Sequence, residues 1–123
     1  MTLQEAIAKI DDLKPNQYKH PHKIGWISDL DGRIYNEVIK HFKNIDEIEW
    51  TPYDENTNPS LVLLVPDPYA EIYIYYLAAK IDWFNGEYTR YNNDMSMFND
   101  AYQAYADEYR KTHESAGINK LRL

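Results

Sequence analysis

A tyrosine-rich stretch toward the end of the chain restricts the possible folds more than any other feature. Apolar side chains recur there at alternating intervals of three and four residues, at Tyr88, Tyr91, Met95, Phe98, Tyr102, Tyr105 and Tyr109. This spacing is the heptad pattern of one helix face, so it predicts a helix from residue 88 to about residue 112.

The aromatic face of this helix has two interpretations. In the first, it packs against a neighbouring helix of the same chain and builds the core. In the second, part of it lies at a contact between subunits, because tyrosine combines an apolar ring with a hydroxyl group that tolerates water. The candidates for such a contact are Tyr91, Tyr102, Tyr105 and Tyr109. Both interpretations hold together if the partner helix covers only one side.

The residues before this stretch predict the partner helix. Asp67 followed by Pro68 suits a helix start, and no helix-breaking residue follows until Gly86. The range 68–85 is apolar nearly all round, which favours a central position in the fold. Because the turn at 85–87 is short, the two helices are expected to form an antiparallel helical hairpin.

The first third of the chain predicts two more helices. Thr2 and Glu5 have the spacing of a capping box, and apolar residues then recur at helical intervals until Pro15 ends the pattern. A second helix is predicted over 21–42, with Pro21 in its first turn and a wide apolar stripe behind it.

The middle of the chain favours a small amount of β-structure. Two short apolar runs, 45–50 and 61–65, indicate one short β-hairpin, joined by a long loop at 51–60. The predicted fold class is therefore mainly α: a small helical bundle with a central antiparallel helical hairpin and room for one short β-hairpin. Residues 1–113 would form this single helical domain, and residues 114–123 a flexible C-terminal tail.

Composition and charge narrow the classes of function. The chain has 123 residues, the length of one domain, and no cysteine, which excludes a disulfide framework and a thiolate metal site. Its net charge of −7 is uneven, with −11 on residues 44–108 and +3 on residues 109–123. An acidic centre repels phosphate groups, so sequence-specific nucleic acid binding is not expected. No secretion signal or membrane span is recognisable, which predicts a cytoplasmic protein.

One short motif imitates a catalytic site. Asp29 and Asp31 lie two residues apart, as in the aspartyl nucleophile loop of haloacid-dehalogenase-type phosphatases. That chemistry needs the first aspartate at the end of a buried parallel strand, with a lysine and a metal ion nearby. Because both aspartates fall in a helical pattern, we interpret them as part of a solvated helix face. The histidines lack metal-ligand spacing and the glycines are dispersed, so we expect no catalytic residue, metal or cofactor.

Three blocks of the sequence resemble a known family: residues 26–35 (WISDLDGRIY), 64–77 (LVPDPYAEIYIYYL) and 85–99 (NGEYTRYNNDMSMFN). From about residue 2 to residue 112, the chain resembles small proteins encoded in the head and packaging gene clusters of tailed phages and prophages of Gram-positive bacteria. That group is similar to head-tail connector proteins, which are also called adaptor or head-completion proteins.

The resemblance implies a structural protein of the virion and not an enzyme. Its subunits would form a ring, commonly of twelve copies, beneath the portal protein after DNA packaging. The ring would be the platform for neck or tail proteins at the head-tail junction, with DNA passing through its channel. Before assembly the protein would be in the host cytoplasm, as a monomer when isolated. In such a ring the acidic region 44–108 would keep DNA from adhering to the channel wall.

The C-terminal tail is the predicted docking element. It is basic and carries spaced apolar side chains, so it is expected to bind the portal or a tail protein through Ile118, Lys120, Leu121, Arg122 and Leu123. The alternative is a frayed terminus that binds nothing.

Two other functions stay open at this point. The chain could be a small phage-encoded protein that binds a host cytoplasmic target. The least favoured alternative is a phosphatase-like enzyme that uses Asp29 and Asp31.

Overall fold

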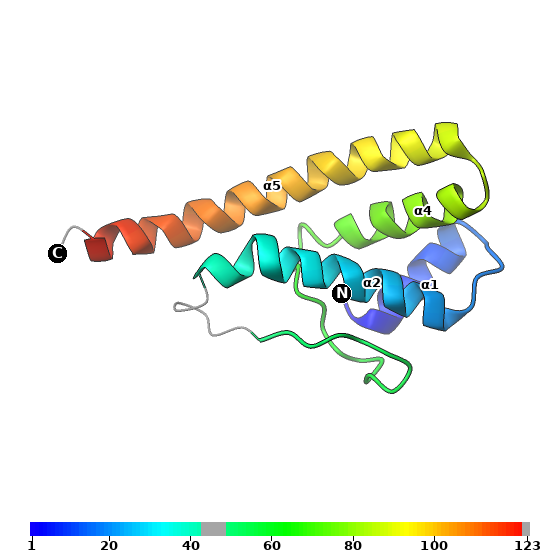
Figure 1. The fold of residues 1–123 in the computed structure, drawn as a ribbon, viewed down its shortest axis with the longest axis horizontal. Coiled ribbons are helices and arrows are strands. Elements are labelled where there is room, and N and C mark those ends of the chain that lie inside the picture. Colours follow the sequence, from blue (N-terminus) through cyan, green and yellow to red (C-terminus); the bar gives the residue numbers. More distant parts are fainter. Residues whose placement is uncertain (43–48, 122–123) are drawn as a thin grey trace.

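The structure is a computed structural model that describes residues 1–42 and 49–121, with the side chains of the last helix described through His113. Within these residues the chain forms helices α1 (Leu3–Leu13), α2 (His20–Glu37), α4 (Ile72–Phe84) and α5 (Tyr88–Leu121), and a short 3-10 helix, η1 (Ile39–Phe42). Helix α4 lies between α5 on one side and α1 and α2 on the other (Figure 1). The predicted mainly α bundle is confirmed.

Helix α1 begins as the sequence predicts. The side-chain oxygen of Thr2 accepts a hydrogen bond from the N–H of Glu5, and the Glu5 carboxylate accepts one from the N–H of Thr2. This reciprocal pair is the capping box, and it satisfies two N–H groups that the start of a helix leaves without partners.

The predicted second helix is divided in two near Val38. Helix α2 has Pro21 in its first turn, as expected, but it ends at Glu37, and η1 continues the chain to Phe42. At this end the Asn36 side chain donates a hydrogen bond to the carbonyl of Gly32. Such a bond competes with the backbone hydrogen bonds of the helix. The β-branched residues that follow, Val38 and Ile39, also have lower helix propensity.

The central helix is shorter than predicted. Helix α4 begins at Ile72 and not at Pro68, because the preceding residues form tight turns in which the N–H of Tyr69 donates to the carbonyl of Pro66. The helix is still buried on most sides, and Leu77 and Ile81 are 0% exposed. Its predicted central position is confirmed.

Helices α4 and α5 form the predicted antiparallel hairpin (Figure 1). Its turn contains Gly86 at a φ of 77°, a left-handed conformation that glycine adopts without strain. On α5 the aromatic face turns partly inward, since Phe98 and Tyr105 are buried in the core. For these two residues the interpretation that the face builds the core is confirmed.

The β-hairpin is not formed by the residues that the structure describes. Most of its first predicted strand, 45–48, lies outside them, and Trp50 is not in a strand. Within the second predicted strand, 61–65, the described residues show one isolated antiparallel bridge, between Val62 and Thr2.

This extended segment is instead fastened to the start of α1. The N–H groups of Leu3 and Gln4, which lie in the first turn of the helix, donate to the carbonyls of Leu61 and Pro59 at 2.9 and 3.0 Å. The helix start therefore obtains its missing acceptors from the connection between η1 and α4.

A buried carboxyl group ties the same connection to the bundle. Asp31 on α2 is 0% exposed, and it accepts hydrogen bonds from the hydroxyl groups of Tyr73 at 2.6 Å and Tyr53 at 2.7 Å, and from the N–H of Leu64 at 3.2 Å. Burial raises the pKa of Asp31, and the three hydrogen bonds oppose that rise. One side chain thus joins α2, the connection and α4.

Helix α5 is the longest element and runs past the rest of the bundle. The sequence predicts an end near residue 112, whereas the helix continues to Leu121, because no proline follows residue 68 and Gly117 alone does not end it. The backbone of 114–121, predicted as a flexible tail, is therefore helical. In Figure 1 this end of α5 projects beyond α2.

None of the described helices has both the length and the apolar run that crossing a membrane requires.

Candidate docking groove

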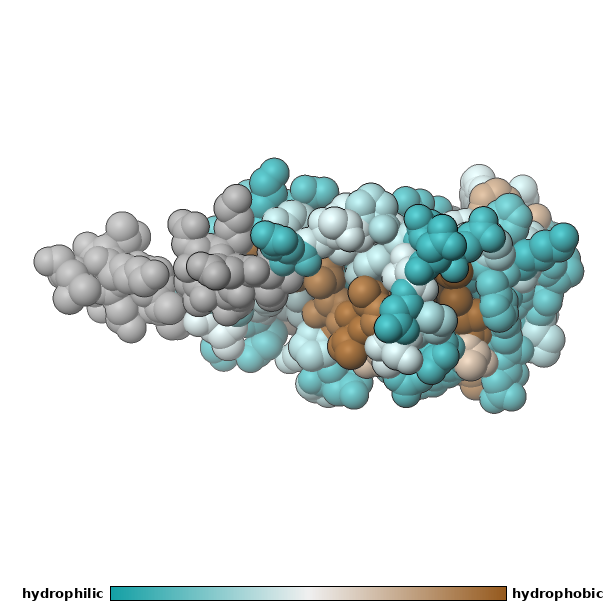
Figure 2. Space-filling view, turned by 90° about the horizontal axis from the view of Figure 1, so that it is seen from below, coloured by the Kyte–Doolittle hydropathy of each residue, from teal (hydrophilic) through white to brown (hydrophobic). Residues whose placement is uncertain are grey.

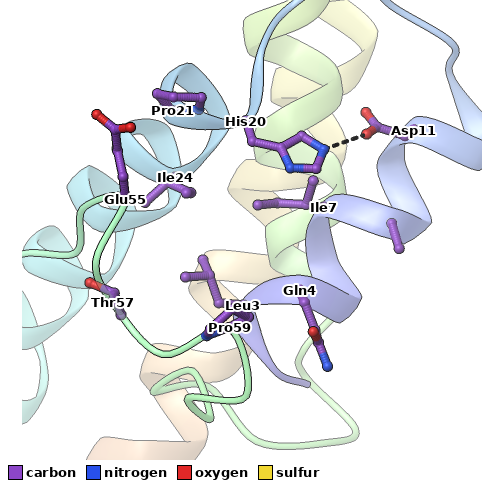
Figure 3. Close-up of a pocket in the computed structure, with 11 residues that line it drawn as sticks. Leu3, Gln4, Ile7, Asp11, His20, Pro21, Ile24, Glu55, Thr57 and Pro59 are labelled. Carbon is purple, nitrogen blue, oxygen red and sulfur yellow. Dashed lines mark ion pairs between the residues drawn. The ribbon is translucent and has the colours of Figure 1, made fainter.

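A groove of about 580 Å³ opens between α1, the start of α2 and the 51–60 loop (Figure 3). One face of α1 forms its first wall, because Leu3, Ile7 and Asp11 lie four residues apart and Ala8 lies beside them. Leu3 and Ile7 also belong to the hydrophobic core, so the apolar floor of the groove is continuous with the core. Its volume is within the range of ordinary ligand sites.

The opposite walls come from two other segments. The first turns of α2 contribute His20, Pro21 and Ile24, and the loop contributes Glu55, Thr57 and Pro59. In Figure 3, Ile24, Ile7 and Leu3 line the interior, while Glu55 and Asp11 stand on opposite sides of the groove. The site is thus a largely apolar groove with one carboxyl group on each side, Asp11 and Glu55.

Hydrogen bonds hold the loop wall in place. The N–H of Tyr53 donates to the Ser28 hydroxyl on α2 at 2.9 Å, which fixes one end of the loop. Farther along, the N–H of Asp54 donates to the Thr57 hydroxyl at 2.8 Å, and the N–H of Asn56 donates to the Asp54 carboxylate at 2.8 Å. These local turns give the wall a defined shape without a strand or a helix.

Asp11 is the centre of the polar cluster at the groove. The ammonium group of Lys23, which is only 2% exposed, donates to the Asp11 carboxylate at 2.6 Å, and the Asn16 amide donates to it at 2.9 Å. Burial works in the opposite direction, but these hydrogen bonds and the nearby positive charge lower the pKa of Asp11. His20 lies 3.7 Å from the second carboxylate oxygen. Asp11 is therefore an ionised and well-anchored group.

This arrangement is suited to holding an amphipathic segment. Its lining is mainly apolar, although Leu3 and Ile7 are only 2% and 5% exposed, and the exposed Glu55 at its side is a carboxyl group that a basic side chain can approach. The one hydroxyl group among its lining residues, on Thr57, already accepts the N–H of Asp54. Among the side chains that the structure describes, those of residues 1–42 and 49–113, no group of three metal-ligating side chains comes together.

Two of the four tyrosines predicted for a subunit contact are held by their own chain. Tyr105 is 4% exposed and lies in the core. The Tyr102 hydroxyl donates to the Glu37 carboxylate at 2.6 Å, and the guanidinium group of Arg33 lies 4.5 Å from the centre of its ring. Burial and the Glu37 acceptor raise the pKa of the Tyr102 hydroxyl.

The other two tyrosines lie closer to the surface. Tyr109 is half-buried beside Phe42 of η1, with ring centres 5.9 Å apart. Tyr91 is half-buried beside Trp83, at 5.0 Å, and lines a second hollow of about 270 Å³ that also contains Arg33. A subunit contact through these residues stays a prediction.

Asp29 and Asp31 do not converge on one site. Asp29 is exposed, whereas Asp31 is buried and holds two tyrosine hydroxyl groups. The interpretation of both as a solvated helix face is therefore wrong for Asp31, because helix positions two apart point in very different directions.

The predicted docking residues of the tail occupy the projecting end of α5. Ile118, Lys120 and Leu121 lie in its last turns, where only the backbone is described. Arg122 and Leu123 lie outside the described residues. Their role in docking stays a prediction.

The sequence does not predict the groove. It arises where the 51–60 loop meets α1 and α2, and that meeting depends on contacts between segments that are distant in the sequence, such as Tyr53 with Ser28. The only local signal was the loop itself, whose length is typical of functional loops.

Comparisons with protein family models, with curated proteins and with solved structures found no match.

Proposed function

We propose that this chain is a structural virion assembly protein, a head-tail connector subunit that docks under the portal protein as a ring. In this role it provides the platform for neck or tail proteins while DNA passes through the channel. The observation that carries the proposal is the length of α5. Its 34 residues span about 51 Å, whereas the 18 residues of α2 span about 27 Å, so α5 extends past the body of the subunit.

A projecting helix on one side and an open groove on another are the features expected of an assembly subunit. Two different surfaces that fit each other produce a head-to-tail contact, and such contacts close into rings when the rotation allows it. The three sequence blocks resemble small proteins of phage head and packaging gene clusters, a group similar to head-tail connector proteins, and this resemblance supports the proposal. Asp11 at the groove is paired with Lys23, and most of the other lining residues are apolar. This combination favours binding over catalysis.

The surface charge also supports a position around DNA. Of the acidic residues in the central region, many are exposed, among them Asp54, Glu55, Asp67, Glu87, Asp100, Asp107 and Glu108. Negative charge along a channel repels the phosphate backbone and lets DNA move without adhering.

Quantitative mass spectrometry of purified particles tests the proposal. The particles come from a phage or prophage that encodes this chain, and the measured quantity is the ratio of this protein to the portal protein. We expect a fixed ratio in tailed particles, and a ring of density beneath the portal in electron microscopy. Absence of the protein from particles that contain the portal rejects the proposal. Absence together with one stoichiometric host protein in pull-downs supports the host-target alternative instead.

A further inference from the structure

We infer that the groove between α1, α2 and the 51–60 loop binds the C-terminal segment, residues 114–123, of a second copy of this chain. The inference rests on the proposed function, because it supplies the contact that joins neighbouring subunits. It also names a second copy, in place of the portal, as the partner of this segment.

The apolar residues of the segment match the floor of the groove. Ile118 and Leu121 lie three residues apart in the sequence, which is the spacing of neighbours on a helix surface. The groove is lined by Ile24, which is half-buried, and by Leu3 and Ile7, which are 2% and 5% exposed (Figure 3). An amphipathic helix that lays its apolar side into a groove between helices is a recurring mode of peptide recognition.

The charges of the two surfaces are opposite. The segment carries Lys120 and Arg122 against one acidic residue, Glu114, so its net charge is +1. Asp11 at the groove already pairs with Lys23, so Glu55 on the loop is the carboxylate most accessible to an incoming cation. Glu55 is exposed and forms no ion pair with another described residue.

The shape of the subunit requires that the segment come from another copy. In Figure 1, the end of α5 lies at one extremity of the molecule, while α1 and the loop lie toward the opposite side. A helix that runs away from the groove does not return its own end to it. Repetition of the contact from copy to copy is a head-to-tail interface, which forms a closed ring or an open filament.

Apolar surface is exposed on the face that contains the loop. Figure 2 shows this face from below, with apolar patches set among mainly hydrophilic atoms. Val62, which follows the loop, is 69% exposed. A neighbouring subunit that docks here would cover part of this surface.

Thiol cross-linking tests the inference directly, because the chain has no cysteine of its own. The double variant Ala8→Cys with Leu121→Cys places one thiol in the groove and one in the segment. Purified protein at high concentration and, separately, portal-containing particles are treated with a short bis-maleimide. We expect a ladder of covalent oligomers. The control pair, Leu13→Cys with Leu121→Cys, has its first thiol on the same helix outside the groove and should give no ladder.

Charge reversal provides an independent test. Glu55→Lys in the Ala8→Cys and Leu121→Cys background should lower the yield of the ladder about two- to fivefold, the size expected for an exposed ion pair. Adding Arg122→Glu should restore it. Asp12→Lys, an exposed change on α1 outside the groove, serves as the control and should leave the yield unchanged.

The outcomes separate this inference from the proposed function. Equal yields for the groove pair and the control pair, in solution and in particles, overturn the inference. Cross-linking of Leu121→Cys to the portal instead of to a second copy also overturns it. In either case a fixed ratio of this protein to the portal would leave the proposed function standing.

Discussion

Asp31 shows how a single side chain can organise a small bundle. Its two oxygens receive the hydroxyl groups of Tyr53 and Tyr73, and the Tyr73 hydroxyl in turn accepts the N–H of Val65 at 2.8 Å. Burial beside the Asp31 carboxyl group raises the pKa of both tyrosine hydroxyls, so they remain protonated donors. The network therefore pairs buried polar groups that would otherwise be costly to remove from water.

Removing the Asp31 carboxyl group should destabilise the protein strongly. We expect Asp31→Ala to lower the free energy of unfolding by about 3 to 5 kcal/mol, because two hydroxyl groups and the N–H of Leu64 lose their acceptor inside the bundle. Asp29→Ala, the matched change on the exposed side of α2, should alter it by less than about 0.5 kcal/mol. Urea unfolding followed by circular dichroism measures both. Equal effects of the two substitutions would show that the network does not hold the fold together.

The sequence partly predicts the burial of Asp31. It lies four residues after Ile27 and three before Ile34, on the apolar stripe of α2, whereas Asp29 lies off that stripe. Its partners Tyr53 and Tyr73 are distant in the sequence, and no local pattern assigns them. The resemblance to a phosphatase loop treats Asp29 and Asp31 as a unit, although α2 places the two side chains on different sides of the helix.

At the scale of elements, two facing carboxyl groups join the helices of the hairpin. Asp82 on α4 is 2% exposed and accepts hydrogen bonds from the Lys14 ammonium group at 2.9 and 2.8 Å. One oxygen of Asp94 on α5 is buried and has no hydrogen-bond partner among the described residues. When Asp94 is protonated, it can donate to Asp82 and satisfy that oxygen.

This pair predicts that stability depends on pH. Burial and the Asp82 carboxylate raise the pKa of Asp94 to about 7, against the opposing charges of Lys14 and Arg90. An acid whose pKa is higher in the folded state than in the unfolded state binds its proton more tightly in the folded state. The stabilisation that the protonated Asp94 provides is therefore lost as pH rises from about 4 to about 7. Asp94→Asn does not titrate and keeps a donor for Asp82. We expect it to be more stable than wild type above pH 7, by about 1 to 2 kcal/mol, a value reduced because Asp94 is partly exposed.

Urea titrations from pH 4 to pH 8 measure this difference. The gap between Asp94→Asn and wild type should widen with pH and become constant above pH 7. Asp100→Asn, on the exposed side of α5, is the control and should follow wild type throughout. A gap that does not change with pH would mean that the pKa of Asp94 is not raised in the folded protein.

Local signals predicted the interior of the helical elements better than their ends. The capping box fixed the start of α1, and Gly86 marked the turn between α4 and α5, because both depend on neighbouring residues alone. The start signal at Pro68 failed, since turns between residues 66 and 71 take up those backbone groups. Helix α5 ends at Leu121 and not near residue 112. The composition of 114–123 suggests a tail, but no proline interrupts the helix there.

For the whole molecule, the fold consists of a body, formed by residues 1–42 and 49–113, and the projecting end of α5. The last described side-chain contacts of α5 with the body are those of Tyr109 and His113 with Phe42 of η1. The body, with its buried Tyr105 and Asp31, therefore has its own core before residue 114 is reached. The backbone of α5 continues to Leu121, and this end of the helix is the segment to which the proposal assigns docking.

A stop after His113 tests this division. The truncated protein should keep its free energy of unfolding within about 0.5 kcal/mol of the full chain, because no described core contact is removed. Its helical circular dichroism should fall only by the share of the missing residues, and it should no longer enter particles. Tyr105→Ala is the contrasting change, since loss of a buried aromatic ring should cost about 3 to 5 kcal/mol. If the truncation destabilises as much as Tyr105→Ala, the end of α5 belongs to the core, and the docking role assigned to it is lost.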